Sequence, residues 1–205
     1  MVRQTKENAE ITKQRIIDAA RRVFLTRGVS RTSMEQIAAA AGVTRGAVYW
    51  HFSNKTELFS VMREQVFLPL IDRMDDNLQL ENNGDPLAQI ERFLNETIQA
   101  LNECATTRET YEIMMIKCEY VDEFSDVLGQ ILNNCDGIIL KIEQLYQRAK
   151  NKGQLSGSHD PAQLALDTHL FFSGLLHMWV KDIEGTHFRD RTKTLIASHI
   201  DLRRN

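Results

Sequence analysis

The sequence predicts an all-α protein of nine helices, and three observations lead to this prediction. Only 3 prolines and 10 glycines interrupt 205 residues, strong helix formers are abundant, and apolar side chains recur at helical spacing. We find no convincing β-strand. Apolar residues make up 42% and charged residues 26% of the chain, which excludes a disordered or fibrous protein.

The first two expected helices lie near the N-terminus. Five apolar side chains share one face of a helix over residues 8–27: Ile16, Ile17, Ala20, Val23 and Phe24. Gly28 ends this helix. A second helix opens at Thr32, where Glu35 three residues later completes a capping box, and this helix stops at Gly42.

The next two expected helices begin at side chains that cap them. Thr44 caps a short helix through about His51, and Asn54 caps a long helix over residues 55–80. Pro69 removes one backbone hydrogen bond from the long helix, so we expect a kink or a break there.

Five further helices complete the expected fold. Asp85-Pro86 and Asp160-Pro161 each place Asp at the N-cap and Pro at the first helical position, so a helix opens at each pair. The five expected spans are 86–104, 108–118, 122–152, 160–183 and 188–202.

Charge is distributed unevenly along the chain. Residues 1–55 contain 10 Lys and Arg and 4 Asp and Glu, a net charge of +6, whereas the remaining residues carry −9. A basic segment joined to an acidic one is typical of a module that binds a polyanion. A solvated basic face explains the charge equally well.

Missing signals disfavour several functional classes. The N-terminal residues lack the apolar core of a signal peptide, and the longest nearly apolar stretch, 170–180, is too short to span a bilayer. We therefore expect a cytoplasmic protein that does not bind membranes. Cys104, Cys118 and Cys135 form no metal-binding pattern, and we interpret them as buried reduced thiols, with a redox sensor as the alternative. No enzyme or cofactor motif is found, so we expect neither catalysis nor a cofactor.

One spacing indicates a specific function. Gly42 lies four positions and Val48 ten positions after Ala38. A helix-turn-helix requires this arrangement: a small residue where the helices approach, a glycine in the turn and an apolar residue that holds the second helix. We therefore divide the chain into a helix-turn-helix DNA-binding domain over 1–54 and a larger helical domain over 55–205.

The third expected helix carries a resemblance to a known family. The stretch TRGAVYWHF at 44–52, followed by Asn54-Lys55 and Glu57-Leu58, is similar to the signature of the TetR family of transcriptional repressors. Residues 43–52 together with KCEY at 117–120 resemble the subgroup that represses multidrug efflux-pump operons. The resemblance implies a homodimer with an N-terminal domain that binds a palindromic DNA operator and a C-terminal domain for ligand binding and dimerisation.

The resemblance also implies a set of DNA contacts. Arg45 is the candidate for a bidentate contact to guanine. Packing inside the domain is the alternative role for Tyr49 and Trp50. The predicted DNA-binding residues are Thr32, Ser33, Thr44, Arg45, Gly46, Tyr49, Trp50, His51 and Lys55.

The helix expected over 160–183 favours a homodimer. Apolar side chains cover most of its circumference, so it must be buried on two sides, by its own core and by the equivalent helix of a second copy. A fully internal helix is the alternative. We expect Phe172→Asp or Leu175→Asp to yield a monomer.

The larger domain is expected to bind a hydrophobic or amphipathic small-molecule inducer. Polar side chains at 169, 173 and 177 border the apolar helix, where they line a cavity or face solvent. By resemblance to the efflux-pump repressors, the ligand-lining candidates are Val66, Phe67, Leu94, Thr97, Tyr111, Met115, Ile138, Ile142, His169, Phe172, Ser173 and His177. Two functions stay open. One is a repressor of an efflux-pump operon that such molecules release from DNA. The other is a helix-turn-helix regulator, an activator included, whose larger domain binds a protein partner.

Overall fold

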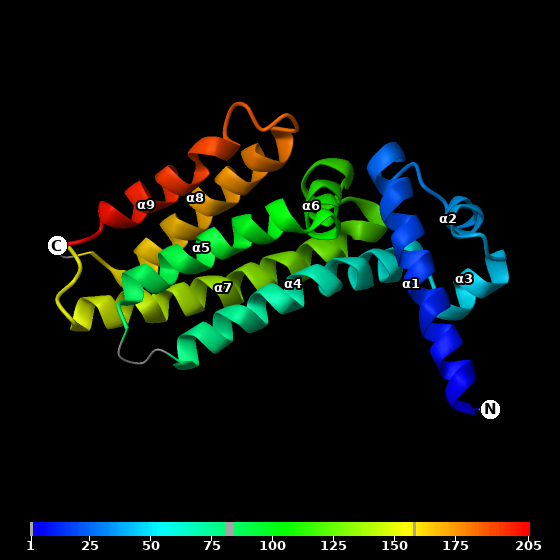
Figure 1. Ribbon diagram of the computed structural model, residues 1–205, viewed down its shortest axis with the longest axis horizontal. Helices are drawn as coiled ribbons and strands as arrows, with labels where there is room; N and C mark the ends of the chain where they lie inside the picture. Colours follow the sequence, from blue (N-terminus) through cyan, green and yellow to red (C-terminus); the bar gives the residue numbers. More distant parts are fainter. Residues whose placement is uncertain (1, 81–83, 158) are drawn as a thin grey trace. The chain divides into compact units, whose positions relative to one another are not determined.

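Nine α-helices make up most of the chain that the structure describes (Figure 1). The computed structural model describes residues 2–80, 84–157 and 159–205, and the side chains of 6–69, 84–157 and 159–205. The helices are α1 Val2–Arg27, α2 Met34–Ala41, α3 Arg45–His51, α4 Lys55–Leu80, α5 Pro86–Glu103, α6 Ala105–Glu112, α7 Ser125–Asn151, α8 Pro161–Lys181 and α9 Thr192–Asp201. The predicted all-α fold is confirmed. None of the described helices combines the length and apolar content that a bilayer crossing needs.

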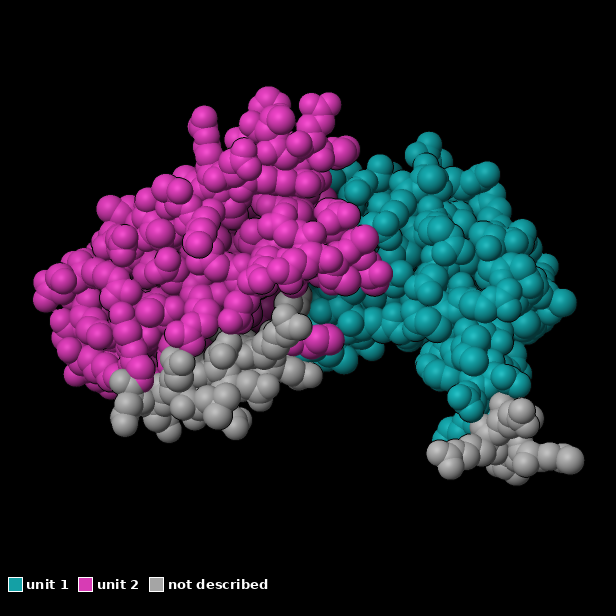
Figure 2. Space-filling model, in the orientation of Figure 1, with its two compact units in different colours: residues 1–68, 109–128 teal, residues 69–108, 129–205 magenta. Residues whose placement is uncertain are grey.

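The chain divides into two compact units (Figure 2). The first unit contains Met1–Leu68 and Glu109–Leu128, and the second contains Pro69–Arg108 and Gly129–Asn205. The predicted boundary of the DNA-binding domain after residue 54 stays a prediction, because compact packing does not define which residues bind DNA.

Pro69 lies inside α4, at the point where the second compact unit begins. The prediction was a kink or a break at this residue. The helix continues through it to Leu80, so a break does not occur, and the kink stays a prediction. A proline inside a helix lacks the N–H that would bond the carbonyl four residues back, so α4 carries Pro69 at the loss of one backbone hydrogen bond.

The three N-terminal helices share an apolar core. Ile16 and Phe24 of α1, Ile37 of α2 and Val48 of α3 have no exposed surface, so the side that each helix buries is the one its apolar residues predict. Gly42 ends α2 in the left-handed region at φ 64°, where a side chain would add strain. The turn of the predicted helix-turn-helix is therefore formed.

The start of α2 differs by one residue from the prediction. Ser33 is the N-cap: its hydroxyl accepts a hydrogen bond from the Gln36 N–H at 3.3 Å, and the Gln36 side chain accepts one from the Ser33 N–H at 3.0 Å. This reciprocal pair replaces the capping box predicted between Thr32 and Glu35. The Glu35 carboxylate is consequently available for a different contact.

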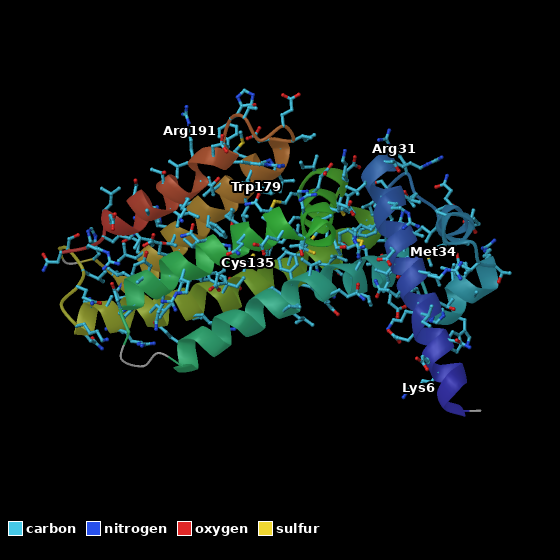
Figure 3. The ribbon with its side chains drawn as sticks, in the orientation of Figure 1. Lys6, Arg31, Met34, Cys135, Trp179 and Arg191 are labelled. Atoms are coloured by element: carbon cyan, nitrogen blue, oxygen red, sulfur yellow. The ribbon has the colours of Figure 1, made fainter. Side chains whose placement is uncertain are left out.

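In the second unit, α5 and α8 begin at the predicted caps. The carboxylates of Asp85 and Asp160 accept hydrogen bonds from backbone N–H groups two residues further on, and Pro86 and Pro161 occupy the first helical position. Helix α9 packs beside α5 and α8 (Figure 1). Trp179 of α8 is fully buried in the core of this unit (Figure 3).

The helix expected over 108–118 is formed differently. Helix α6 ends at Glu112, and a π-helical turn, Ile113–Lys117, follows it. Such a turn winds more loosely than an α-helix and often marks a functional position. The Lys117 carbonyl accepts a hydrogen bond from the Val29 N–H at 2.9 Å, which ties the turn to the residues that follow α1.

Candidate nucleic-acid interface and ligand-binding residues

Helix α3 presents a polar and aromatic face away from the core. Thr44 caps the helix by accepting a hydrogen bond from the Ala47 N–H at 3.2 Å, and buried Val48 fixes which side faces inward. Tyr49 and Trp50 are both exposed, Trp50 at 73%. Neither ring is buried in the core of the domain, the alternative that the sequence left open, so both present surface to a partner.

Arg45 is oriented by two neighbouring side chains. Its Nε lies 3.0 Å from Glu35 Oε1, and its guanidinium carbon lies 5.3 Å from the centre of the Tyr49 ring. Glu35 belongs to the first turn of α2, so this ion pair connects the two helices of the motif. The pKa of Glu35 is lowered, because its own backbone N–H and the Ser33 hydroxyl hydrogen-bond the carboxylate and the Arg45 charge lies nearby.

Ser33 and Thr32, both predicted to bind DNA and taken as candidates for phosphate contacts, differ in exposure. Ser33 is exposed, whereas Thr32 is 3% exposed and its hydroxyl donates a hydrogen bond to the Gly28 carbonyl at 2.7 Å. The Thr32 side chain therefore stabilises the turn between α1 and α2 and is not available to a phosphate. This corrects the prediction for Thr32.

Lys55, the other predicted backbone contact, is held inside the first unit. Its side chain is 12% exposed and its Nζ lies 3.2 Å from Glu123 Oε1 and 5.5 Å from the centre of the Phe124 ring. The neighbouring Thr56 hydroxyl donates a hydrogen bond to the Glu123 carbonyl at 3.4 Å. The phosphate contact of Lys55 stays a prediction, and it requires the amino group to share or leave Glu123.

Gly46 and His51 complete the predicted surface of α3. Gly46 is exposed and His51 is half-buried, with the His51 ring centre 4.5 Å from that of Trp50. The pKa of His51 is lowered, mainly because burial disfavours the charged imidazole and also because Lys13 lies nearby. This environment favours the neutral form of the ring. On α1, Lys6 is exposed (Figure 3) and adds positive charge to this unit.

The predicted ligand-lining residues are divided between the two compact units. In the first unit, the rings of Phe67 and Tyr111 stack with their centres 4.8 Å apart. Val66 is buried and Met115 is half-buried. Aromatic and thioether side chains of this kind suit an apolar ligand, but in the described structure they also serve as packing.

In the second unit, the predicted lining residues lie on α5, α7 and α8. His169 Nε2 and Ser173 Oγ are 3.4 Å apart on successive turns of α8. Burial lowers the pKa of His169, and Asp136 of α7 opposes this shift. The buried members of the set are Leu94, Thr97, Ile142 and Phe172, and the half-buried members are Ile138, His169, Ser173 and His177. That all of these residues border one cavity stays a prediction.

Two open pockets that involve other residues lie among the described residues of the second unit. One, of about 400 Å³, is lined by Lys181, Asp182, Ile183, Glu184, His187 and Phe188. The other, of about 240 Å³, is lined by His159, Asp160, Gln163, Leu164 and Asp167. In the first pocket, one Asp182 oxygen accepts hydrogen bonds from the N–H groups of residues 187, 188 and 189, which fixes the connection between α8 and α9.

Two acidic residues of the candidate interface escaped prediction. Glu35 and Glu123 each form an ion pair with a predicted DNA contact. A signal for Glu35 was present, because Ser33 and Gln36 also match the capping-box pattern and leave Glu35 without a capping role. Glu123 lies far from Lys55 in the sequence, and no local spacing rule joins them.

Two sequence families match the chain. Residues 16–62 match the family described as bacterial regulatory proteins, tetR family. Residues 85–204 match the C-terminal region of the MAATS-type transcriptional repressors. The chain belongs to the TetR family. This family consists of regulators of transcription rather than enzymes, so the predicted family and the absence of catalysis are confirmed.

Individual members of the family show how close the relationship is. The transcriptional regulator TtgR of Pseudomonas putida is 37% identical over 188 residues, which cover 88% of this chain and 85% of TtgR. The crystal structure of NalD, the secondary repressor of the MexAB-OprM multidrug efflux pump in Pseudomonas aeruginosa, has a TM-score of 0.87 at 33% identity and covers 97% of this chain and 98% of NalD. The SmeT–triclosan complex has a TM-score of 0.82 at 28% identity and covers 95% of this chain and 92% of SmeT. This chain is a TetR-family repressor related to repressors of multidrug efflux operons.

Proposed function

We propose that this chain represses a multidrug efflux-pump operon. It binds a palindromic operator as a homodimer and leaves the operator when a hydrophobic or amphipathic small molecule binds. The outer face of α3 carries this proposal, because Arg45, Tyr49 and Trp50 are exposed on a helix that buried Val48 holds in place. The relationship to NalD and SmeT supports the efflux-pump assignment. Binding to chromosomal DNA places the protein in the bacterial cytoplasm.

The proposed DNA contacts are of two kinds. Arg45 donates hydrogen bonds to O6 and N7 of a guanine in the major groove, which gives base specificity. Contacts to phosphates, sugars and further base edges set the position of the helix on the duplex. These remaining contacts are assigned to Ser33, Thr44, Gly46, Tyr49, Trp50, His51 and Lys55.

An apolar strip on α8 supports the homodimer. Leu166, Leu170, Gly174 and Met178 follow one another every four residues and are all exposed. A second copy related by a two-fold axis covers this strip with its own, because the two surfaces are identical. Leu195 of α9 is exposed as well. Two copies supply two α3 helices for the two halves of a palindrome.

The proposed inducer acts through linkage between two binding events. A ligand that binds more tightly to a conformation unsuited to the operator lowers the affinity for the operator. By reciprocity, the bound operator lowers the affinity for the ligand by the same factor. In the first unit, Phe67, Tyr111 and Met115 are the aromatic and thioether side chains that suit an apolar ligand. In the second unit, the half-buried side chains of His169 and Ser173 are polar groups of the kind that orient a ligand. That the related repressor SmeT forms a complex with triclosan supports this ligand class.

A second candidate function is a regulator, an activator included, whose C-terminal part binds a protein. One observation favours it. Ile183, in the connection between α8 and α9, is 76% exposed and lines the open pocket of about 400 Å³. An exposed apolar side chain beside an open pocket is more typical of a protein contact than of an enclosed ligand site.

Fluorescence anisotropy of the full chain on labelled DNA tests the proposal. An operator duplex is first selected from a random-sequence pool, and triclosan, deoxycholate and tetraphenylphosphonium are then titrated into the complex. We expect at least one compound to weaken operator binding about tenfold or more. Failure to select any operator contradicts the repressor. A selected operator that none of the compounds affects contradicts the inducer and favours the protein-binding alternative.

A further inference from the structure

Glu35 places a carboxylate on the outer side of the helix-turn-helix, beside the arginine proposed to read guanine. Both side chains of the pair are well exposed, Arg45 at 65% and Glu35 at 50%. An acidic group repels phosphates, so its position at a DNA-binding surface requires a physical reason. We propose that Glu35 is a positioning residue that orients Arg45 for base contact and weakens binding to non-operator DNA. The proposal rests on the proposed function of Arg45.

The Glu35 carboxylate has no capping role and lies beside Arg45. Because Ser33 and Gln36 form the capping box of α2, Glu35 is not needed to cap the helix. The pKa of Glu35 is lowered by its own backbone N–H, by the Ser33 hydroxyl and by the nearby Arg45 charge, all of which favour the ionised carboxylate. An ionised carboxylate 3.0 Å from Arg45 Nε is a charge-assisted partner that orients a flexible arginine.

The contact determines which part of the Arg45 guanidinium is available. Glu35 engages Nε at 3.0 Å, and the Tyr49 ring lies against the guanidinium carbon at 5.3 Å. The two terminal nitrogens are then the donors left for DNA. A parallel pair of N–H donors matches O6 and N7 of one guanine. Holding the side chain in this orientation before binding reduces the conformational entropy lost on contact.

The negative charge of Glu35 favours the guanine contact by orienting Arg45, but it weakens non-specific binding to DNA. Binding to arbitrary DNA depends almost entirely on phosphate charge, and the carboxylate offsets the Arg45 charge toward phosphates. Operator binding retains the guanine hydrogen bonds and is weakened less. Glu35 therefore increases the ratio of operator affinity to non-operator affinity, which determines whether a repressor finds its site.

The test compares Glu35→Gln with a matched control in the full chain. Glu184→Gln removes the same charge from an exposed acid of the second unit. Dissociation constants are measured for the selected operator and for a scrambled duplex across a series of salt concentrations. For Glu35→Gln we expect scrambled-duplex affinity to rise about 3- to 10-fold, with a steeper salt dependence, and operator affinity to stay level or fall. The control should leave the ratio of the two affinities unchanged. An unchanged ratio in Glu35→Gln overturns the proposal.

A second measurement isolates the orientation of Arg45. Replacing each half-site guanine by 7-deazaguanine removes the N7 acceptor, and the affinity lost at the contacted guanine reports the bidentate contact. We expect Glu35→Gln to reduce this loss, and to have no such effect in an Arg45→Ala background. If Arg45→Ala itself leaves operator affinity and guanine preference unchanged, the proposed role of Arg45 fails. If Arg45→Ala weakens the operator but Glu35→Gln changes neither measurement, only the inference about Glu35 fails.

Discussion

Helices α3 and α8 each expose a face that we assign to a partner, but the sequence encodes the two faces differently. Helix α3 has 7 residues, and Val48 is its one buried side chain, so a single anchor determines which residues face outward. Helix α8 has 21 residues, and apolar side chains occupy both its buried side and its exposed strip. A DNA-binding face can therefore be predicted from a short motif, whereas an apolar partner face is indistinguishable from the core residues beside it.

The sequence-based expectation for α8 shows this difficulty. Phe172 and Leu175 were expected at the dimer interface, but they are 7% and 8% exposed in the single chain and belong to its own core. The exposed apolar residues are instead Leu166, Leu170 and Met178. Periodicity indicates that a helix is apolar on two sides, but it does not assign either side to the core.

Of the substitutions that test the two faces, Leu170→Asp has the largest expected effect on operator affinity. A carboxylate at the centre of the strip cannot be buried against its symmetry-related copy, so the dimer dissociates and operator affinity falls about 100-fold or more. Sedimentation velocity should show a monomer. Thermal unfolding should show a near-normal melting temperature, because Leu170 is exposed in the single chain. Leu175→Asp should instead lower the free energy of unfolding by about 3 kcal/mol or more. A Leu170→Asp protein that remains dimeric contradicts the assignment of the strip.

Arg45→Ala tests the α3 face. Loss of a bidentate guanine contact should weaken operator binding by about 1–3 kcal/mol and relax the preference for guanine at one position of each half-site. Anisotropy titrations on the operator and on single-base variants measure both effects. Equal affinities of the variant and the wild type for the operator contradict the assignment.

Two substitutions, Lys55→Met and Glu123→Gln, test the role of the ion pair between Lys55 and Glu123. If Lys55 reaches a phosphate, Lys55→Met should weaken operator and scrambled duplexes alike, by about 3- to 10-fold, and reduce the salt slope by about one. Glu123→Gln should then strengthen both complexes, because the amino group is released. A lower melting temperature in both variants, with unchanged salt slopes, would instead limit Lys55 to a structural role.

A smaller expected effect is a dependence of folding stability on pH, and it arises from His199 of α9, which contacts Thr168 on the buried side of α8. His199 Nε2 lies 3.1 Å from the Thr168 hydroxyl, which also lies 2.7 Å from the Tyr146 hydroxyl. Burial and then the nearby Arg203 charge lower the pKa of His199 to about 4. Between the ordinary histidine pKa near 6.5 and this value, the unfolded chain binds a proton that the folded chain does not, so stability falls as pH decreases through that range.

The expected slope for this one group is at most about 1.4 kcal/mol per pH unit. Thermal unfolding at pH 7 and pH 5 measures it, and His199→Gln, which does not titrate, should show a smaller difference between the two pH values. Equal pH dependence in the variant and the wild type shows that His199 does not contribute. The α3 face should be unaffected by this substitution, so operator binding at pH 7 serves as the control.

Local chemistry explains which features the sequence predicted. The caps at Asp85 and Asp160 and the turn at Gly42 depend on neighbouring residues, and the structure confirms all three. The start of α2 was assigned one residue too early because Thr32 and Ser33 are both good N-caps with a suitable partner three residues later. Ser33 rather than Thr32 is the cap, and the Thr32 hydroxyl instead donates to the Gly28 carbonyl four residues earlier. The capping-box pattern alone does not reveal this second local contact.

Long-range contacts explain what the sequence did not predict. The Lys55–Glu123 pair joins distant segments, and the ion pair of Arg45 with Glu35 depends on the angle between α2 and α3. The proposed ligand-lining residues are the same apolar types that fill the core, so neither composition nor spacing separates the two roles. The outward-facing residues of α3 were predicted more fully, because the buried three-helix core fixes the face on which they lie; that they contact DNA stays a prediction.

The two tryptophans occupy opposite environments, and this gives the protein two built-in optical reporters. Trp50 of α3 is 73% exposed and Trp179 of α8 is fully buried. Trp50 should emit at longer wavelength and be quenched by iodide until a duplex shields it, whereas Trp179 should resist iodide until the helices around it melt. With Trp50→Phe and Trp179→Phe as single-emitter variants, one cuvette can follow DNA occupancy and unfolding separately, without an attached dye.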